Sequence, residues 1–145
     1  MKTSVELPNG QLGFLLVQTS WLKQRINSSA FKGLNVTYVQ FVILAGILEL
    51  GVNNQIVTQQ TIVAERRLDK AMVSSVVKTL LQKKMITKMN HPSDHRAMIL
   101  ALTQEGERIA RKGKEIAKHV DAMFFDHIDK EILRGVLEKL LNENK

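Results

Sequence analysis

The fold is decided by residues 58–102, which read TQQTIVAERRLDKAMVSSVVKTLLQKKMITKMNHPSDHRAMILAL. Thr58 and Asp69 are residue types that cap helix N-termini, so they predict a short helix ending at about Arg67 and an amphipathic helix over 70–84. The period then changes to that of strands over 85–89 and 97–102, and the residues between them have the composition of a turn. This stretch therefore predicts two helices followed by a β-hairpin.

Helices are expected on both sides of this stretch. Residues 11–30 carry aliphatic side chains at helical spacing, and residues 38–50, behind a Thr37 cap, have almost no polar face, which indicates a central buried helix. Thr103 caps a long helix, and a last helix begins near Asp129 with an apolar stripe over 132–141. The chain is thus predicted to be mainly α with a small β-hairpin wing, a winged helix-turn-helix domain flanked by N- and C-terminal helices.

Composition limits the protein class. The 145 residues are 44% hydrophobic, which fits one folded domain over 1–145 and argues against disorder. The absence of cysteine excludes disulfides and thiolate chemistry and fits a reducing cytoplasm. No secretory signal precedes residue 11, and no apolar stretch approaches the roughly 20 residues of a membrane span. We expect a cytoplasmic protein with no membrane partner.

Positive charge is concentrated where the helices and hairpin are predicted. Residues 55–100 hold eight Lys and Arg against three Asp and Glu, so they carry +5 of the net +7. Neutralising phosphates releases counterions, so a basic segment of this kind indicates a nucleic-acid partner. In a winged helix-turn-helix the second helix of the turn enters the major groove, which makes double-stranded DNA the expected partner.

The wing segment also resembles a known signature. Asp94-His95-Arg96, followed by Leu100, Leu102-Thr103 and Gly106, is similar to the wing pattern of the MarR family of bacterial transcription regulators. Other positions that match the family over the rest of the chain are Thr37, Gln40, Phe41, Leu44, Thr58, Gln59, Ile62, Leu68, Asp69, Lys70, Val73, Ser74, Val77 and Leu80. The resemblance implies a homodimer, with dimerisation helices at 11–31 and 104–145 and a DNA-binding lobe at 37–102.

This sequence departs from the family at several positions. Arg67 and Lys84 stand where glycine is common, and a non-glycine residue in a left-handed turn costs on the order of 1 kcal/mol, so these turns are expected to differ in geometry. Lys88 replaces the usual Arg that leads into the wing, and Ser75 replaces a residue that is often basic. The operator of a relative should therefore not be transferred to this chain.

The DNA contacts are expected on the polar sides of these elements. Thr58 and Gln60 begin the short helix and suit phosphate, while Arg96 at the wing tip suits a narrow minor groove. Asp94 is expected to pair with the Arg96 guanidinium across the turn. The full predicted set is Thr58, Gln60, Lys70, Ala71, Met72, Ser74, Ser75, Lys78, Lys88, Asp94 and Arg96.

The resemblance also implies a small-molecule effector that binds between the dimer helices and the DNA-binding lobe. Trp21, Tyr38 and Phe41 are candidate lining residues, although aromatic residues at helical spacing more often belong to a core. The four histidines are expected to be ordinary surface or packed residues, and neither a metal nor a cofactor is predicted. The chain also has no P-loop, dinucleotide or metalloprotease motif, so an enzyme is not expected.

The predicted function is sequence-specific binding of double-stranded DNA by a homodimer on a pseudo-palindromic operator, as a ligand-responsive repressor. The alternative is a winged-helix protein-interaction module, an anti-repressor or assembly factor without specific DNA binding. An acidic or apolar recognition face would favour this alternative.

Overall fold

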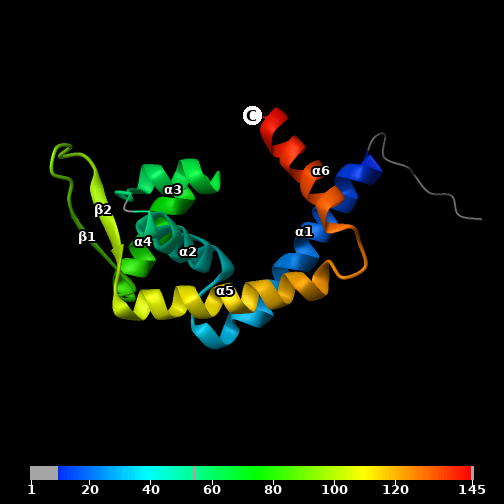
Figure 1. Ribbon diagram of the computed structural model, residues 1–145, viewed down its shortest axis with the longest axis horizontal. Coiled ribbons are helices and arrows are strands. Elements are labelled where there is room, and N and C mark those ends of the chain that lie inside the picture. Colours follow the sequence, from blue (N-terminus) through cyan, green and yellow to red (C-terminus); the bar gives the residue numbers. More distant parts are fainter. Residues whose placement is uncertain (1–9, 54, 145) are drawn as a thin grey trace, which may run out of the picture.

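Six α-helices, one 3-10 turn and a two-stranded antiparallel sheet make up residues 10–53 and 55–144, the part of the chain that the computed structural model describes. The elements in chain order are α1 (Gly10–Phe31), η1 (Lys32–Leu34), α2 (Tyr38–Val52), α3 (Gln59–Arg66), α4 (Lys70–Gln82), β1 (Ile86–Asn90), β2 (Met98–Leu102), α5 (Gln104–Phe124) and α6 (Lys130–Glu143). This order confirms the predicted winged helix-turn-helix with flanking helices (Figure 1).

The predicted caps begin the helices as expected. The Thr58 hydroxyl accepts a hydrogen bond from the Thr61 amide at the start of α3, and the Asp69 carboxylate accepts one from the Met72 amide at the start of α4. The Thr103 hydroxyl caps α5 in the same way. Each cap satisfies an amide that has no partner inside its own helix, which is why these residue types locate helix starts.

Several element boundaries differ from the prediction. The helix expected over 70–84 ends at Gln82, and the strands begin at Ile86 and Met98 rather than at 85 and 97. The early end of α4 has a local cause, because the Met85 amide donates to the Leu80 carbonyl and closes the helix. This is the bonding pattern of a helix that ends on a left-handed residue.

The turns at Arg67 and Lys84, where glycine is common in the family, both have the left-handed conformation. Arg67 has φ 51° and Lys84 has φ 59°, so the expectation that these turns would differ in geometry is wrong. Their backbone bonds explain the outcome: the Arg67 amide donates to the Val63 carbonyl and the Lys84 amide to the Leu81 carbonyl. These bonds hold the left-handed conformation although neither residue is glycine.

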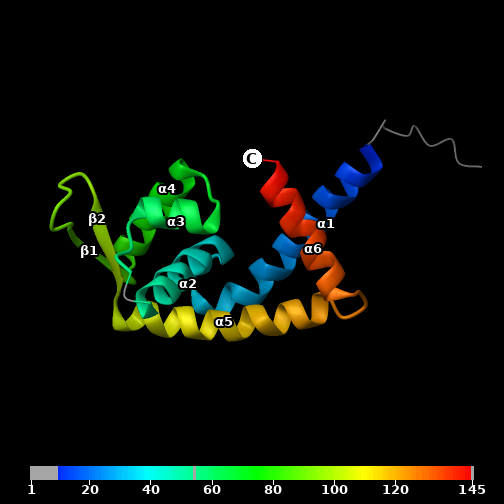
Figure 2. The same ribbon diagram turned by 45° about the horizontal axis from the view of Figure 1, so that its top comes forward.

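The core of the lobe surrounds α2. The fully buried side chains include Ile43 and Leu44 of α2, Ile62 of α3, Leu80 of α4 and Ile109 of α5. Figures 1 and 2 show α3 and α4 on one side of α2 and α5 along the other. Helix α4 therefore rests on a packed platform rather than on a loop.

Two glycines let α5 approach this platform closely. A Cβ on Gly106 would lie 1.9 Å from the Met85 carbonyl oxygen, and one on Gly113 would lie 2.4 Å from the Phe41 ring. The start of α5 is further tied to the turn after α4, because the Thr103 hydroxyl donates to the Lys84 carbonyl at 2.8 Å. These contacts fix the hairpin between α4 and α5.

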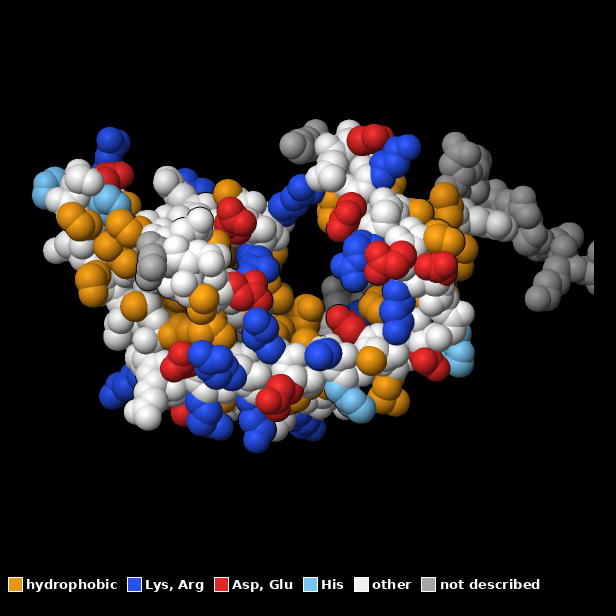
Figure 3. Space-filling view, in the orientation of Figure 1, with side chains coloured by type: hydrophobic (Ala, Val, Ile, Leu, Met, Phe, Trp, Pro, Cys, Tyr) orange, Lys and Arg blue, Asp and Glu red, His pale blue; other side chains and the backbone are white. Residues whose placement is uncertain are grey.

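Helices α1 and α6 extend away from the lobe as an arm. Helix α1 continues through η1 into α2, and α6 follows α5 (Figures 1 and 2). The space-filling view shows an opening between the lobe and this arm (Figure 3). The Arg67 guanidinium donates to the Asn142 side-chain oxygen at 2.6 Å, a contact between α6 and the end of α3. No single helix within 10–53 and 55–144 is long and apolar enough to cross a membrane, and the pair 11–34 and 38–52 that reaches such a length together is bent by 70°.

Candidate nucleic-acid interface

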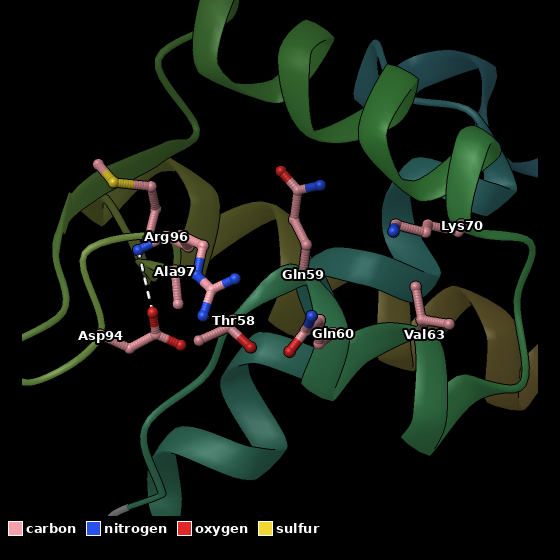
Figure 4. A pocket seen from close by; sticks show the side chains of 9 residues that line it. Thr58, Gln59, Gln60, Val63, Lys70, Asp94, Arg96 and Ala97 are labelled. Carbon is pink, nitrogen blue, oxygen red and sulfur yellow. Dashed lines mark hydrogen bonds between the residues drawn. The ribbon is translucent and has the colours of Figure 1, made fainter.

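The N-termini of α3 and α4 and the wing border one groove of about 630 Å³. Its lining residues are Thr58, Gln59, Gln60, Val63, Lys70, Asp94, Arg96, Ala97 and Met98. Five of them belong to the predicted set of DNA-contacting residues. Side chains from the three elements lie around the same groove (Figure 4).

A backbone contact joins the wing to the start of α3. The Leu100 amide of β2 donates to the Val57 carbonyl at 2.8 Å, immediately before the cap residue Thr58. The strands themselves pair in register from Ile86 with Leu102 to Asn90 with Met98. The distance between the wing and the first turn of α3 is therefore set by hydrogen bonds within the lobe.

Helix α4 presents a small, polar and basic face. Val73, Val77 and Leu80 are buried on its inner side. The predicted contact residues Lys70, Ala71, Ser74, Ser75 and Lys78 are exposed, and Met72 is half-buried. Because each turn of the helix is anchored by an apolar residue, this outer face is held in one orientation toward solvent.

The wing corrects one predicted contact. Asp94 accepts a hydrogen bond from the backbone amide of Arg96 at 3.0 Å, as the dashed line in Figure 4 shows. Within the described wing, no ion pair joins the two side chains, so the predicted pairing of Asp94 with the guanidinium is wrong. A short carboxylate side chain reaches the amide two residues ahead, and this local bond holds the turn.

Some groove residues were missed by the sequence prediction. Gln59 extends into the groove between Thr58 and Gln60 (Figure 4), and Met98 lines its wing side. Gln59 is the first helical residue after the Thr58 cap, where a polar side chain beside free helix amides was the available signal. The predicted Lys88 lies exposed on β1 and does not line the groove.

Comparison with known proteins agrees with this geometry. The family model described as the ArnR1-like winged-helix domain matches residues 32–120, which is more than half of the chain. The uncharacterized HTH-type transcriptional regulator YdcH of Bacillus subtilis (strain 168) is 33% identical over 138 residues, 94% of each chain. The chain belongs to this winged-helix family of HTH-type transcriptional regulators.

Solved structures show the same fold over nearly the whole length of the regulator. The DNA complex of S. aureus MepR has a TM-score of 0.84 at 17% identity and covers 97% of this chain and 100% of that one. Bordetella bronchiseptica BpsR, whose DNA binding is regulated by 6-hydroxynicotinic acid, has a TM-score of 0.76 at 20% identity, covering 93% and 99%. A transcriptional regulator of the MarR family from Rhodococcus sp. RHA1 has a TM-score of 0.75 at 18% identity, covering 96% and 94%. The proteins to which the chain is similar are transcriptional regulators and not enzymes, in agreement with the prediction.

The regulator also has a cavity of about 690 Å³ where α1, the start of α2, the end of α5 and α6 meet. The Lys23 ammonium lies in its wall, 2.8 Å from an Asp121 carboxylate oxygen and 2.9 Å from the Asn27 side-chain oxygen. The same ammonium is 5.6 Å from the Tyr38 ring centre and 5.7 Å from that of Phe124. The Asp121 carboxylate, just outside the lining, therefore balances the positive charge of Lys23.

Tyr38 is the predicted aromatic residue that lines this cavity. Burial and, to a smaller extent, the negative charge of Asp121 raise the pKa of its phenol, so the hydroxyl stays protonated and can donate. Of the three predicted aromatic residues, Tyr38 and Phe41 lie side by side with their ring centres 5.8 Å apart, and Trp21 lies apart from them. Phe41 is 5% exposed and packs on Phe31 in the core, and Trp21 is 53% exposed beside Phe14, outside the cavity lining.

Proposed function

We propose that the regulator binds a pseudo-palindromic operator as a homodimer, with sequence specificity, and acts in the cytoplasm as a repressor that a small molecule releases. The observation that carries the proposal is the single groove in which the starts of α3 and α4 meet the wing, beside the polar face of α4. In a winged helix-turn-helix this arrangement lets one helix enter the major groove while the wing reaches an adjacent backbone or minor groove.

Each predicted contact has a role in this proposal. Thr58 and Gln60 bind phosphate beside the free amides at the start of α3, and Lys70, Lys78 and Lys88 add charge contacts with the backbone. Ala71, Met72, Ser74 and Ser75 face base edges, where the apolar pair suits a thymine methyl group and the hydroxyls accept or donate hydrogen bonds. Arg96 enters the minor groove, and Asp94 holds the turn from which it projects.

The homodimer is supported by the apolar faces that α1 and α6 leave exposed. The exposed aliphatic residues of these helices are Leu12, Leu15, Leu16, Val17, Leu22, Ile132, Val136, Leu137, Leu140 and Leu141. Exposed apolar patches of this extent mark interaction sites in folded proteins. We propose that these helices, within 11–31 and 104–145, interlock with those of a second copy, and that the two-fold axis sets the recognition helices about 34 Å apart.

The cavity between α1, α2, α5 and α6 is the proposed effector site. It lies where the arm meets the first turn of the lobe, with Tyr38 in its wall. A ligand that fills it better in one arrangement of arm and lobe shifts the population toward that arrangement, and a changed lobe spacing no longer fits DNA. The regulation of BpsR by 6-hydroxynicotinic acid supports a small-molecule effector for this fold.

The test is selection of bound fragments from the source genome by the purified regulator. The winning duplex and a scrambled duplex are then titrated across a salt series. A shared palindrome bound about a thousandfold more tightly than scrambled DNA at physiological salt supports the proposal. Steep salt dependence without a motif would mean a nonspecific coating protein.

The alternative is a protein-interaction module, which predicts no binding to any duplex at any salt. The recognition face argues against it, because Lys70 and Lys78 are exposed there and no acidic residue lies within α4.

Arg96→Ala gives the sharpest test of the interface. The Arg96 side chain is exposed, so its removal should lower operator affinity by about tenfold and leave thermal stability nearly unchanged. Arg111→Ala is the matched control, because Arg111 is an exposed arginine of α5 that does not line the groove. Equal operator affinity of the two variants would reject the assignment of Arg96.

A further inference from the structure

We infer that His91 is a positioning residue of the wing, and that operator binding depends on its imidazole being neutral. This inference rests on the proposed DNA-binding function and concerns a residue outside the predicted contacts. His91 Nδ1 accepts hydrogen bonds from the backbone amides of Ser93 and Asp94, each at 3.1 Å. The Ser93 hydroxyl lies 3.4 Å from the same nitrogen.

The ring takes the place that an asparagine side chain commonly fills in a turn. Its Nδ1 is attached to Cγ, as the Oδ1 of asparagine is, so it reaches the amides two and three residues ahead in the same way. A lone pair on Nδ1 exists only in the neutral imidazole that carries its proton on Nε2. The turn geometry therefore selects one tautomer and one charge state of His91.

The turn that His91 holds is the one that places Arg96. Asp94, whose amide donates to His91, accepts the Arg96 amide on its own carboxylate at 3.0 Å. The Ala97 amide then donates to the Asp94 carbonyl at 3.1 Å, and the His91 amide to the Ala97 carbonyl at 3.3 Å. These bonds form one closed set, so the direction in which the Arg96 side chain leaves the wing depends on the imidazole.

Protonation of His91 reverses its role in this set. A proton on Nδ1 turns the acceptor into a donor that faces two other donors, so both amide bonds are lost and the turn must rearrange. The other charged and titratable groups around the turn are Asp94, His95 and Arg96, with Lys70 across the groove. Asp94 holds the Arg96 amide, so a rearrangement in which Asp94 turns toward an imidazolium also releases Arg96.

The direction of the pH effect separates this role from a direct DNA contact. A histidine that binds phosphate gains charge on acidification and binds DNA more tightly. A histidine that must stay neutral to hold the wing gives weaker binding instead. We expect operator affinity to fall about tenfold between pH 7.5 and pH 5.5, the order that losing one or two hydrogen bonds gives.

The experiment compares the full-length wild type with His91→Asn, His91→Ala and His95→Asn, using the tightest duplex from the genomic selection at pH 7.5 and pH 5.5. His91→Asn keeps an acceptor at the same position without a titrating group, so it should bind as the wild type does at pH 7.5 and lose the pH response. His91→Ala should bind about tenfold more weakly at both pH values. His95→Asn, a wing histidine with no bond to these amides, should respond to pH as the wild type does.

Two results would overturn the inference: wild-type affinity in His91→Ala at pH 7.5, or an unchanged pH response in His91→Asn. Nitrogen-15 NMR of the free regulator tests the acceptor role without DNA. It should show the His91 proton on Nε2 at pH 7.5 and slowed amide exchange at Ser93 and Asp94 that is lost in His91→Ala. If no duplex binds the wild type, the proposed function fails, and a proton found on Nδ1 would separately reject the role of His91.

Discussion

Replacing Lys84 by glycine should stabilise the protein. Lys84 has φ 59° in the turn that ends α4, and within the described residues its ammonium has no hydrogen bond or ion pair. A residue with a Cβ destabilises the folded state by about 1–2 kcal/mol in the left-handed region, and glycine does not. Glycine in turn lowers the stability by about 0.4–1 kcal/mol, because it makes the unfolded chain more flexible. The net gain is then about 0.5–1 kcal/mol.

The matched control is Lys84→Ala, which removes the same charge and side-chain stem but keeps the Cβ. Urea unfolding at one fixed protein concentration compares the variants, because association would otherwise shift the midpoint. We expect Lys84→Gly to exceed Lys84→Ala by about 0.5–1 kcal/mol and to melt roughly 2–4 °C higher. Equal stabilities would show that the left-handed turn costs this chain nothing and would refute the reasoning.

Two further substitutions test the packing and the charges of the lobe. Gly106→Ala places a Cβ 1.9 Å from the Met85 carbonyl oxygen, so α5 must move. Urea unfolding should show that the free energy of unfolding falls by about 1–3 kcal/mol. A fall below about 0.5 kcal/mol would contradict this contact. The pKa of Glu49 is lowered, because burial, which raises it, is outweighed by hydrogen bonds and charge from Arg66 and Lys114. Glu49→Gln should therefore lose stability at pH 7, by less than about 1 kcal/mol for this partly exposed group. The difference in stability from the wild type should vanish as the pH falls through the folded-state pKa of Glu49. Melting curves that differ equally at pH 7 and pH 3 would contradict the assignment.

Most of the fold could be predicted because its signals are local. Thr58, Asp69 and Thr103 each begin the helix that they were expected to cap, since a cap and the amide that it satisfies lie within three residues. The hairpin was recognisable because β1 and β2 follow one another with a short turn between them. Interactions that close within a few residues leave their pattern in the sequence.

The errors occurred where a backbone bond overrode the expected side-chain role. Asp94 and Arg96 suggest an ion pair by their charges, but the carboxylate binds the nearer amide instead. The helix propensity of Lys84 favours a helix that continues to this residue. Backbone hydrogen bonds from the amides of Lys84 and Met85 end the helix at Gln82 instead. Residue type alone does not show which of two available hydrogen-bonding partners a side chain binds.

The difference between the two candidate sites has the same cause. The groove draws its lining from residues 58–98, so caps, helix faces and a turn motif could indicate five of its members before the structure was known. The cavity joins Leu16 of α1 to Leu137 of α6 through Tyr38 and Phe124, positions that only the packing of four helices brings together. Periodicity predicts that an aromatic residue faces inward, but it does not show which inner surface the residue faces. Phe41 therefore lies in the core and Tyr38 in the cavity wall, although the sequence treated them alike. In this regulator, sequence reasoning reaches further into the proposed DNA interface than into the proposed effector site, because the interface is built from neighbouring elements of the chain.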